Sequence, residues 1–149
     1  MTTQTAPPVT ECTPQEAWEH LQNQPSAQLV DVRTRPEWSF VGVPDLTQLG
    51  REAVLSEWRM FPDMAVNTGF ADALLDGMAP AGPSTIFFLC RSGARSMEAA
   101  QAVARASAER GTPIDCVNIA EGFEGDLDQH RHRGHLNGWK ARRLPWRQS

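Results

Sequence analysis

An uninterrupted apolar run, Ile86 to Leu89, is followed at once by a short cationic loop and then by an alanine-rich stretch. Four consecutive apolar residues suit a strand that is covered on both faces of a parallel sheet. The stretch that begins at Ser96 favours helix because alanine, glutamate, glutamine and arginine dominate it. The sequence therefore predicts a strand over 85–89, a tight loop, and a helix over 96–110.

Cys90 lies where the chain leaves this strand. A helix N-terminus presents unpaired amide N–H groups and a partial positive charge, and Arg91 and Arg95 add two full charges nearby. Such surroundings favour the thiolate over the thiol. The loop is thus predicted to be an anion cradle that holds a nucleophilic sulfur.

Length and composition narrow the possible classes. A chain of 149 residues, 40% hydrophobic and 21% charged, is expected to form one folded domain. The net charge of −4 gives no electrostatic reason to expect nucleic acid or a membrane as partner. Residues 1–10 lack the features of a secretory signal, and no apolar stretch approaches the roughly 18 residues of a membrane span. With three cysteines, we expect a reducing, cytoplasmic location.

Helix and strand patterns alternate along the rest of the chain. Thr13 and Glu16 flank Pro14 as a capping box, which predicts a helix over 14–22. Further elements are predicted as follows: a strand over 27–32, a short helix over 35–40, a helix over 67–78 capped by Asn67, and a strand over 114–119. Residues 54–58 are compatible with either a strand or a helical turn.

This alternation predicts an α/β fold of three layers, α/β/α, with a central parallel sheet. Ligands of such sheets bind beyond the carboxyl ends of the strands, which is where Cys90 is expected. We divide the chain into a flexible tail (1–9), a folded domain (10–125) and a loop-rich C-terminal extension (126–149) that packs on the same domain.

Three segments together carry a family resemblance. They are Leu29-Val30-Asp31-Val32-Arg33 followed by Glu37-Trp38, then Cys90-Arg91-Ser92-Gly93-Ala94-Arg95-Ser96, then Asn118-Ile119-Ala120-Glu121-Gly122-Phe123. In this order and spacing, over roughly residues 8–125, the chain resembles a single-domain rhodanese-like sulfurtransferase. The tail 138–146 also resembles that of some bacterial members, which have glycine at the position of Arg143. The turn at 42–46 and the long insert up to Pro83 depart from the smallest members.

The resemblance implies an enzyme of the thiosulfate sulfurtransferase (rhodanese) type. Cys90 is then the nucleophile and persulfide carrier, and the substrate-binding residues are Arg91, Ser92, Gly93, Ala94, Arg95 and Ser96. The implied partners are a small sulfur donor such as thiosulfate and an acceptor such as cyanide or a thiol, with thioredoxin-like or sulfur-carrier proteins as candidate acceptors. No cofactor is implied. Covalent catalysis divides the transfer into two easier displacements.

Two other functions fit the same framework. Phosphatases and arsenate reductases use Cys-x5-Arg, whereas Arg95 gives Cys-x4-Arg here and Ser96 stands where their arginine would be. The shorter loop suits one sulfur atom better than a phosphate. The third possibility is a non-catalytic rhodanese-like interaction module, but such relatives usually lack the cysteine.

The remaining polar candidates are interpreted as structural. Asp31 and Arg33 end another strand and are expected to form a charge pair that fixes the neighbouring loop. Cys116 is expected to be inert core, and nothing in the sequence brings Cys12 near Cys90 as a resolving thiol.

The segment 126–135 contains three histidines and two aspartates, which are ligand types of zinc. Its spacing matches no established closed site, and Arg131 and Arg133 would repel a cation, so the sequence predicts no metal. We expect instead a solvated loop whose role, if it borders the active site, is to attract anionic donors or an acidic partner.

Overall fold

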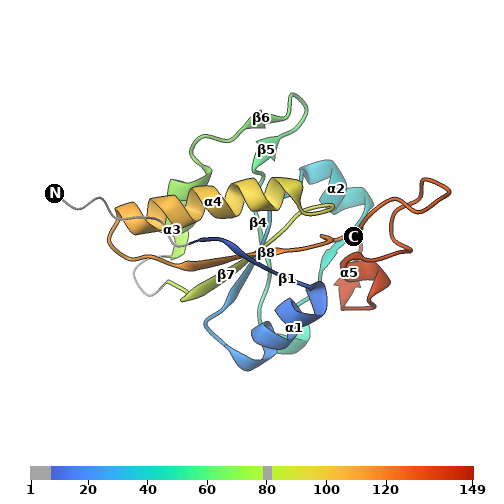
Figure 1. Ribbon diagram of the computed structural model, residues 1–149, viewed down its shortest axis with the longest axis horizontal. Helices are drawn as coiled ribbons and strands as arrows, with labels where there is room; N and C mark the ends of the chain where they lie inside the picture. Colours follow the sequence, from blue (N-terminus) through green and yellow to red (C-terminus); the bar gives the residue numbers. More distant parts are fainter. Residues whose placement is uncertain (1–7, 79–81) are drawn as a thin grey trace.

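The protein is described by a computed structural model for residues 8–78 and 82–149. Its centre is a five-stranded parallel sheet in the order β1-β8-β7-β2-β4 (Figure 1). The strands are β1 (Thr10–Cys12), β2 (Gln28–Asp31), β4 (Val54–Leu55), β7 (Thr85–Leu89) and β8 (Asp115–Ile119). The predicted α/β fold with a central parallel sheet is confirmed.

Helices cover both faces of the sheet. They are α1 (Pro14–Asn23), α2 (Arg35–Phe40), α3 (Phe70–Met78), α4 (Ala94–Glu109) and α5 (Gly138–Ala141). Helices α3 and α4 lie on one face, α1 and α5 lie on the other, and α2 lies at the end of the sheet where Cys90 is found. Among the described residues, no helix combines the length and the apolar character needed to cross a membrane.

The alternating side chains of β7 divide the core into two halves. Ile86, Phe88 and Cys90 pack with α3 and α4, whereas Phe87 and Leu89 pack with α1 and α5. All five are at most 1% exposed. Because both faces of the strand are buried, its sequence is continuously apolar instead of alternating.

Two short antiparallel pairs lie outside the main sheet. One pairs β3 (Val43–Pro44) with β9 (Trp146–Arg147), and the other is a hairpin of β5 (Arg59–Met60) and β6 (Ala65–Val66). Neither pair was predicted, because two-residue strands carry no periodic signal. A 3-10 helix, η1 (Thr47–Leu49), lies between β3 and β4.

The helix predicted over 14–22 is confirmed as α1 (Pro14–Asn23). Thr13 and Glu16 form the reciprocal capping box at the start of α1. Residues 54–58 begin with a strand, β4. Of the predicted tail 1–9, residues 1–7 lie outside the described residues, and the strand β1 that follows was not predicted. It pairs with β8.

The predicted first residues of two helices were wrong. Helix α3 begins at Phe70, and the Asn67 side chain donates to the Glu57 carbonyl at 3.2 Å instead of capping the helix. Helix α4 begins at Ala94, two residues before the predicted start, with Gly93 as its N-cap at φ 116°. Because a glycine tolerates this φ, the helix can begin directly behind the cysteine.

The C-terminal residues contribute to the core through Trp139. Its side chain is fully buried, and its Nε1 donates to the Pro145 carbonyl at 2.7 Å. Its ring packs edge to face on the ring of Trp18, with 6.0 Å between the ring centroids. Arg143 has φ 61°, the left-handed conformation that favours glycine. A glycine would adopt this conformation with less strain than an arginine.

We predict that Trp139→Ala lowers the free energy of unfolding by about 3–5 kcal/mol, because it leaves a large cavity and removes the hydrogen bond from Trp139 Nε1 to the Pro145 carbonyl. The measurement is urea denaturation followed by far-UV circular dichroism. The control is Phe40→Ala, since Phe40 is 80% exposed and its loss is expected to cost less than about 0.5 kcal/mol. Equal losses in the two variants would contradict the assignment of Trp139 to the core.

Candidate active site

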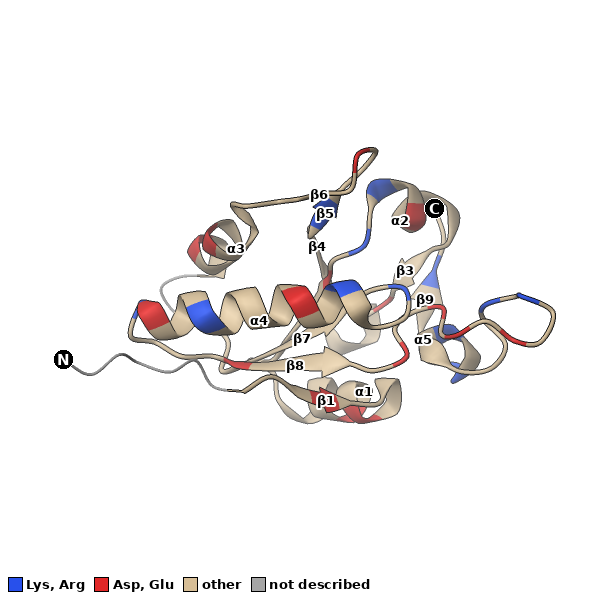
Figure 2. Cartoon of the chain, turned by 45° about the horizontal axis from the view of Figure 1, so that its top comes forward, with Lys and Arg blue, Asp and Glu red and all other residues tan. Residues whose placement is uncertain are grey.

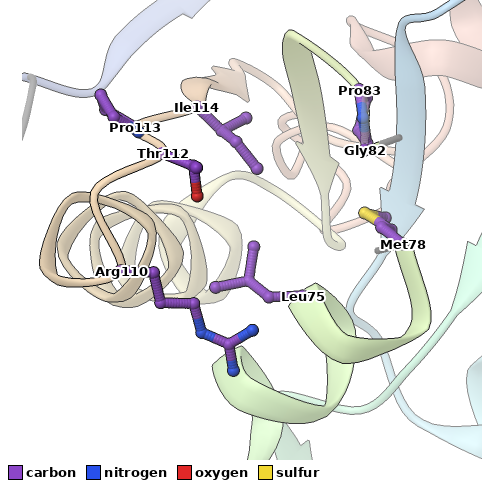
Figure 3. Close-up of a pocket in the computed structure, with 8 residues that line it drawn as sticks. All are labelled: Leu75, Met78, Gly82, Pro83, Arg110, Thr112, Pro113 and Ile114. Atoms are coloured by element: carbon purple, nitrogen blue, oxygen red, sulfur yellow. The ribbon is translucent and has the colours of Figure 1, made fainter. Parts of the chain in front are cut away.

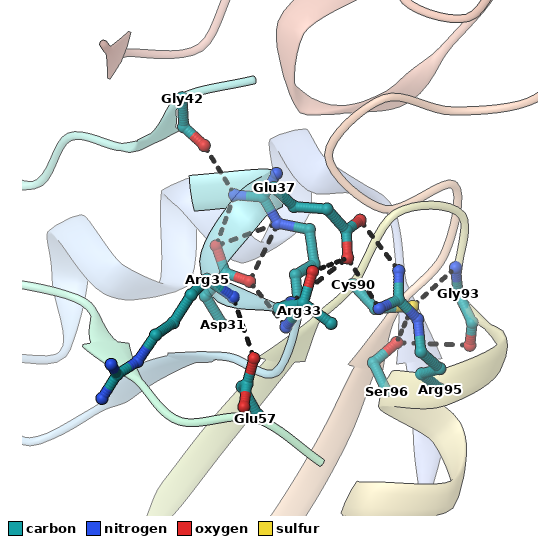
Figure 4. A network of polar contacts seen from close by, with 11 residues as sticks. Asp31, Arg33, Arg35, Glu37, Gly42, Glu57, Cys90, Gly93, Arg95 and Ser96 are labelled. Atoms are coloured by element: carbon teal, nitrogen blue, oxygen red, sulfur yellow. Dashed lines mark hydrogen bonds and ion pairs between the residues drawn. The ribbon is translucent and has the colours of Figure 1, made fainter. Parts of the chain in front are cut away.

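Cys90 follows the last residue of the central strand, and its sulfur receives hydrogen bonds from the loop that follows. We call residues 90–96 the Cys90 loop. The Gly93 amide N–H donates to Cys90 Sγ at 3.1 Å, and Ser96 Oγ lies 3.2 Å from the same sulfur (Figure 4). Both donors belong to the N-terminal end of α4. The sequence prediction of a sulfur facing a helix N-terminus is therefore reproduced by this geometry.

Ser96 connects the sulfur to a second buried polar residue, Asn118. Asn118 Nδ2 donates to Glu11 at 2.9 Å and to the Gly93 carbonyl at 3.1 Å, so its Oδ1 faces the Ser96 hydroxyl. A hydroxyl has one proton and can also accept. Ser96 can therefore accept from a Cys90 thiol while donating to Asn118, or turn its proton toward a Cys90 thiolate. The arrangement accommodates both protonation states of the sulfur.

A turn after β8 holds the backbone of the Cys90 loop from the other side. The Phe123 amide donates to the Cys90 carbonyl at 2.8 Å, and the Glu124 amide donates to the Arg91 carbonyl at 3.0 Å. A Cβ at Gly122 would lie 2.5 Å from the Arg91 carbonyl, which is closer than any side chain allows. Only glycine permits this contact between the two segments.

Arg95 is held by Glu37 of α2. Two hydrogen bonds join the guanidinium and the carboxylate, at 2.8 and 2.9 Å, in the bidentate geometry typical of strong pairs (Figure 4). Burial by itself raises the pKa of Glu37, but Arg95 and the hydrogen bonds from Thr34 outweigh burial and lower this pKa to about 2. The carboxylate thus offsets the charge of Arg95, which the sequence assigned to anion binding.

Asp31 and Arg33 form the structural pair that the sequence predicted. Both side chains are fully buried, and Arg33 Nη2 donates to Asp31 Oδ2 at 2.7 Å and to the Gly42 carbonyl at 2.8 Å. The Arg33 guanidinium also stacks 4.2 Å from the centre of the Phe123 ring. The pair therefore joins the end of β2 to the turn that supports the Cys90 loop.

A cavity of about 310 Å³ lies over this end of the sheet. It is lined by Glu37, Met64, Arg91, Arg95, Glu124 and Arg133. Cys90 itself is 1% exposed and is not among the residues that line the cavity. A reagent that reaches its sulfur must therefore be small or must present a single projecting atom.

The loop of residues 126–137 rises from the same end of the molecule as the N-terminus of α4 (Figure 2). Arg133 lines the cavity, and its Nη1 donates to the Gly125 carbonyl at 2.6 Å. Arg131, which the sequence grouped with it, is exposed and is not one of the described residues that line the cavity. The two arginines thus have different places relative to the site.

The other two cysteines stay outside this site. Cys12 is half-buried in β1 and Cys116 is buried in β8. Burial raises the pKa of each thiol to about 12. Both thiols are therefore neutral and poorly nucleophilic near neutral pH.

Sequence reasoning gave no role to four residues of the site: Glu37, Met64, Asn118 and Glu124. Two of them had a usable signal. Glu37 follows Thr34 by three residues, as in a capping box, and Asn118 is a polar residue between the apolar Val117 and Ile119 of a buried strand. A buried polar side chain needs a partner, so Asn118 could have been assigned to the network.

A second pocket lies at the opposite end of α4, between α3 and the start of β8 (Figure 3). Its lining includes Leu75, Met78 and Ile114 together with the charged residue Arg110. Arg110 is paired with Asp72 and Asp76, each at 3.0 Å. The pocket therefore presents apolar surface and an already paired cation, and we assign it no chemistry.

Comparison with known proteins identifies relatives over most of the chain. The model of the rhodanese-like domain matches residues 13–129. The protein RC0915 of Rickettsia conorii is 37% identical over 131 residues, covering 88% of this chain and 91% of the relative. The crystal structure of Rv0390 from M. tuberculosis matches with a TM-score of 0.80 and 46% identity, over 95% of this chain and 98% of that one.

A more distant structure shares the fold. It is a polysulfide-sulfur transferase homodimer from Wolinella succinogenes, with a TM-score of 0.55 and 18% identity over 95% of this chain and 80% of that one. At this identity the likeness concerns the fold alone.

We predict that Glu37→Gln removes a pH-dependent part of the stability. Because the folded-state pKa of about 2 lies below the unfolded value of about 4.3, ionised Glu37 stabilises the fold above pH 4.3 or so, and this contribution is lost as pH falls through 2. The wild type should exceed the variant by about 1.5–3 kcal/mol at pH 6, and this difference should shrink toward pH 2.

The measurement is chemical denaturation of both proteins between pH 6 and pH 2. Glu98→Gln is the control, because Glu98 forms a half-exposed pair with Arg59 at 3.3 Å that contributes less than about 1 kcal/mol. A wild-type advantage that does not change with pH would refute the role given to the Glu37 carboxylate.

Proposed function

The chain belongs to the rhodanese-like domain family, and we propose that it is a sulfurtransferase that carries sulfane sulfur as a persulfide on Cys90. The observation that carries the proposal is the position of Cys90 Sγ, beyond a central strand, 3.1 Å from the Gly93 amide nitrogen and 3.2 Å from Ser96 Oγ. Fixed donors of this kind stabilise negative charge on sulfur without reorganising during the reaction.

In the first step the Cys90 thiolate attacks the outer sulfur of a donor such as thiosulfate. A Cys90–sulfur bond forms, the sulfur–sulfur bond of the donor breaks, and sulfite leaves with the electron pair. In the second step a thiolate or cyanide attacks the outer sulfur of the persulfide, and the Cys90 thiolate leaves. The bonds and charges balance without an added oxidant or reductant, and the result is the two-step pattern of covalent catalysis.

The narrow access to Cys90 supports the transfer of a small group. The residue is 1% exposed, so the outer sulfur of a donor can approach more readily than a tetrahedral phosphate group. Phosphate transfer also needs an arginine directed at the phosphate. Arg95 is instead engaged in two hydrogen bonds with Glu37. These features favour sulfur transfer over the phosphatase and arsenate reductase alternatives.

The charges at the cavity support an anionic donor. Arg91 is exposed at its rim, and Arg133 adds a second positive charge from the loop 126–137, against the single further carboxylate of Glu124. Because Arg95 is neutralised by Glu37, we assign the attraction of the donor to Arg91 and Arg133. The activity in the name of the Wolinella succinogenes structure belongs to the same class of reaction, although its similarity to this chain concerns the fold alone.

We predict that Cys90→Ser abolishes sulfur transfer, because a serine hydroxyl is neutral near pH 7 and is a poor sulfur carrier. The measurement is intact mass after incubation with thiosulfate, in which the wild type gains the mass of one sulfur atom and the variant gains none. Thiocyanate formation from cyanide gives the corresponding rate.

Cys12→Ser is the matched control and should keep both the mass gain and the rate, since the Cys12 thiol is neutral. A chromogenic aryl phosphate tests the phosphatase alternative on the same samples and should remain intact. Sulfur incorporation by Cys90→Ser, or hydrolysis of the aryl phosphate that depends on Cys90, would overturn the proposal.

We predict that Arg133→Ser raises the KM for thiosulfate roughly threefold to tenfold at low salt, because it removes one positive charge from the cavity. The effect should decrease at high ionic strength, where surface charges are screened. Arg131→Ser removes the same charge from outside the cavity and should change KM much less. Equal effects of the two substitutions would show that only the net charge of the loop matters.

A further inference from the structure

The loop 126–137 brings two imidazoles and a carboxylate close to one another. One potential ligand atom from each of Asp128, His132 and His135 lies within 4.8 Å of the other two. The ring centres of His132 and His135 are 6.1 Å apart. Two nitrogen donors and one carboxylate oxygen form a ligand set that Zn²⁺ uses in open sites, where water or another ligand occupies the fourth position.

The backbone of the loop holds the carboxylate in place. Asp128 Oδ1 accepts the amide N–H of His130 at 2.8 Å and that of His132 at 2.9 Å, and the Asp128 amide donates to the His132 carbonyl at 2.8 Å. These bonds use Oδ1 and leave Oδ2 for another partner. They also hold the backbone of residue 128 next to that of residue 132. Two of the three ligand residues are therefore close together before any ion binds.

The ends of the loop are braced as well. The Asp126 amide donates to Asn137 Oδ1 at 2.8 Å, and Asn137 Nδ2 donates back to Asp126 Oδ2 at 3.1 Å. The Gly134 amide donates to the Glu124 carbonyl at 2.7 Å. The segment that carries the ligands is therefore closed at its base by side-chain bonds and tied to the turn after β8.

The three ligand atoms would need to move only slightly closer together to bind one ion. Ligands about 2.1 Å from a tetrahedral ion are about 3.4 Å from one another, which is somewhat closer than the outer limit of 4.8 Å in the structure. The side chains of His132 and His135 are exposed, so they can rotate toward an ion without disturbing the core.

The arginines of this loop led the sequence analysis to predict no metal here. The structure changes that argument for Arg133, because its guanidinium donates to the Gly125 carbonyl and lines the cavity over the Cys90 loop. The Arg133 guanidinium therefore contacts groups other than the three proposed ligands. Arg131 directly precedes His132, and its positive charge still disfavours a bound cation.

We propose that Asp128, His132 and His135 form a binding site for a divalent transition-metal ion, with Zn²⁺ as the representative. Imidazole nitrogens suit Zn²⁺, Ni²⁺ and Cu²⁺, whereas Mg²⁺ and Ca²⁺ require mainly oxygen ligands. The site is distinct from Cys90 and does not depend on the sulfurtransferase function.

The test is calorimetric titration of the full, untagged chain with Zn²⁺. A Cys90→Ser background is used, because a thiolate would itself bind this ion. One ion per chain is expected, and a parallel titration with Mg²⁺ should give no binding. His132→Ala and His135→Ala should each raise the dissociation constant by at least about tenfold. His132 and His135 are both exposed, and circular dichroism of the metal-free variants checks that the fold is retained.

His130→Ala is the matched control, because His130 belongs to the same loop but lies outside the ligand group. It should change the dissociation constant by less than about threefold. Arg131→Ser should tighten binding, since it removes a positive charge near the ion. No Zn²⁺ binding by the starting protein, or equal losses in His130→Ala and His132→Ala, would overturn the proposal.

Discussion

The site depends on one close backbone contact, between Gly122 and the Cys90 loop. At this distance a Cβ on residue 122 would collide with the Arg91 carbonyl, and the adjoining amides bond directly to the carbonyls of Cys90 and Arg91. The carbonyls at the end of β7 are thereby satisfied, while Gly93 and Ser96 remain directed at the sulfur. The loop can hold charge because its backbone is fixed before any substrate arrives.

The C-terminal residues extend this support. The Trp139 amide donates to the Gly122 carbonyl at 2.9 Å, and the Lys140 amide donates to the Phe123 carbonyl at 3.2 Å. Because the Trp139 side chain is fully buried, helix α5 anchors the turn, and the turn anchors the Cys90 loop. From the other side, the buried Asp31–Arg33 pair reaches the same turn through the Phe123 ring. Segments from both ends of the chain thus converge on one short turn.

The sequence predicted the parts that rest on local patterns. The apolar strand 85–89, the capping box at Thr13 and the strand-to-helix transition at Cys90 each have a signal within a few residues. The parts it missed depend on distant partners. Residues 10–12 become a strand only because β8 lies beside them, and the pairing of Arg95 with Glu37, 58 residues away, has no local signal. Pairing of this kind leaves no periodic trace in the sequence.

The pairing of Glu37 with Arg95 also determines which charges near Cys90 remain unpaired by a neighbouring side chain. Since Glu37 pairs with Arg95, the other charged residues that line the cavity are Arg91, Glu124 and Arg133 of the loop 126–137, and the positive charges exceed the negative by one. Arg133 lies between His132, a proposed metal ligand, and Gly134, whose amide ties the loop to Glu124. An ion bound at the proposed site would add positive charge to the same loop, so it would not oppose the attraction of an anionic donor by Arg133. The two proposed roles of this loop are therefore electrostatically compatible.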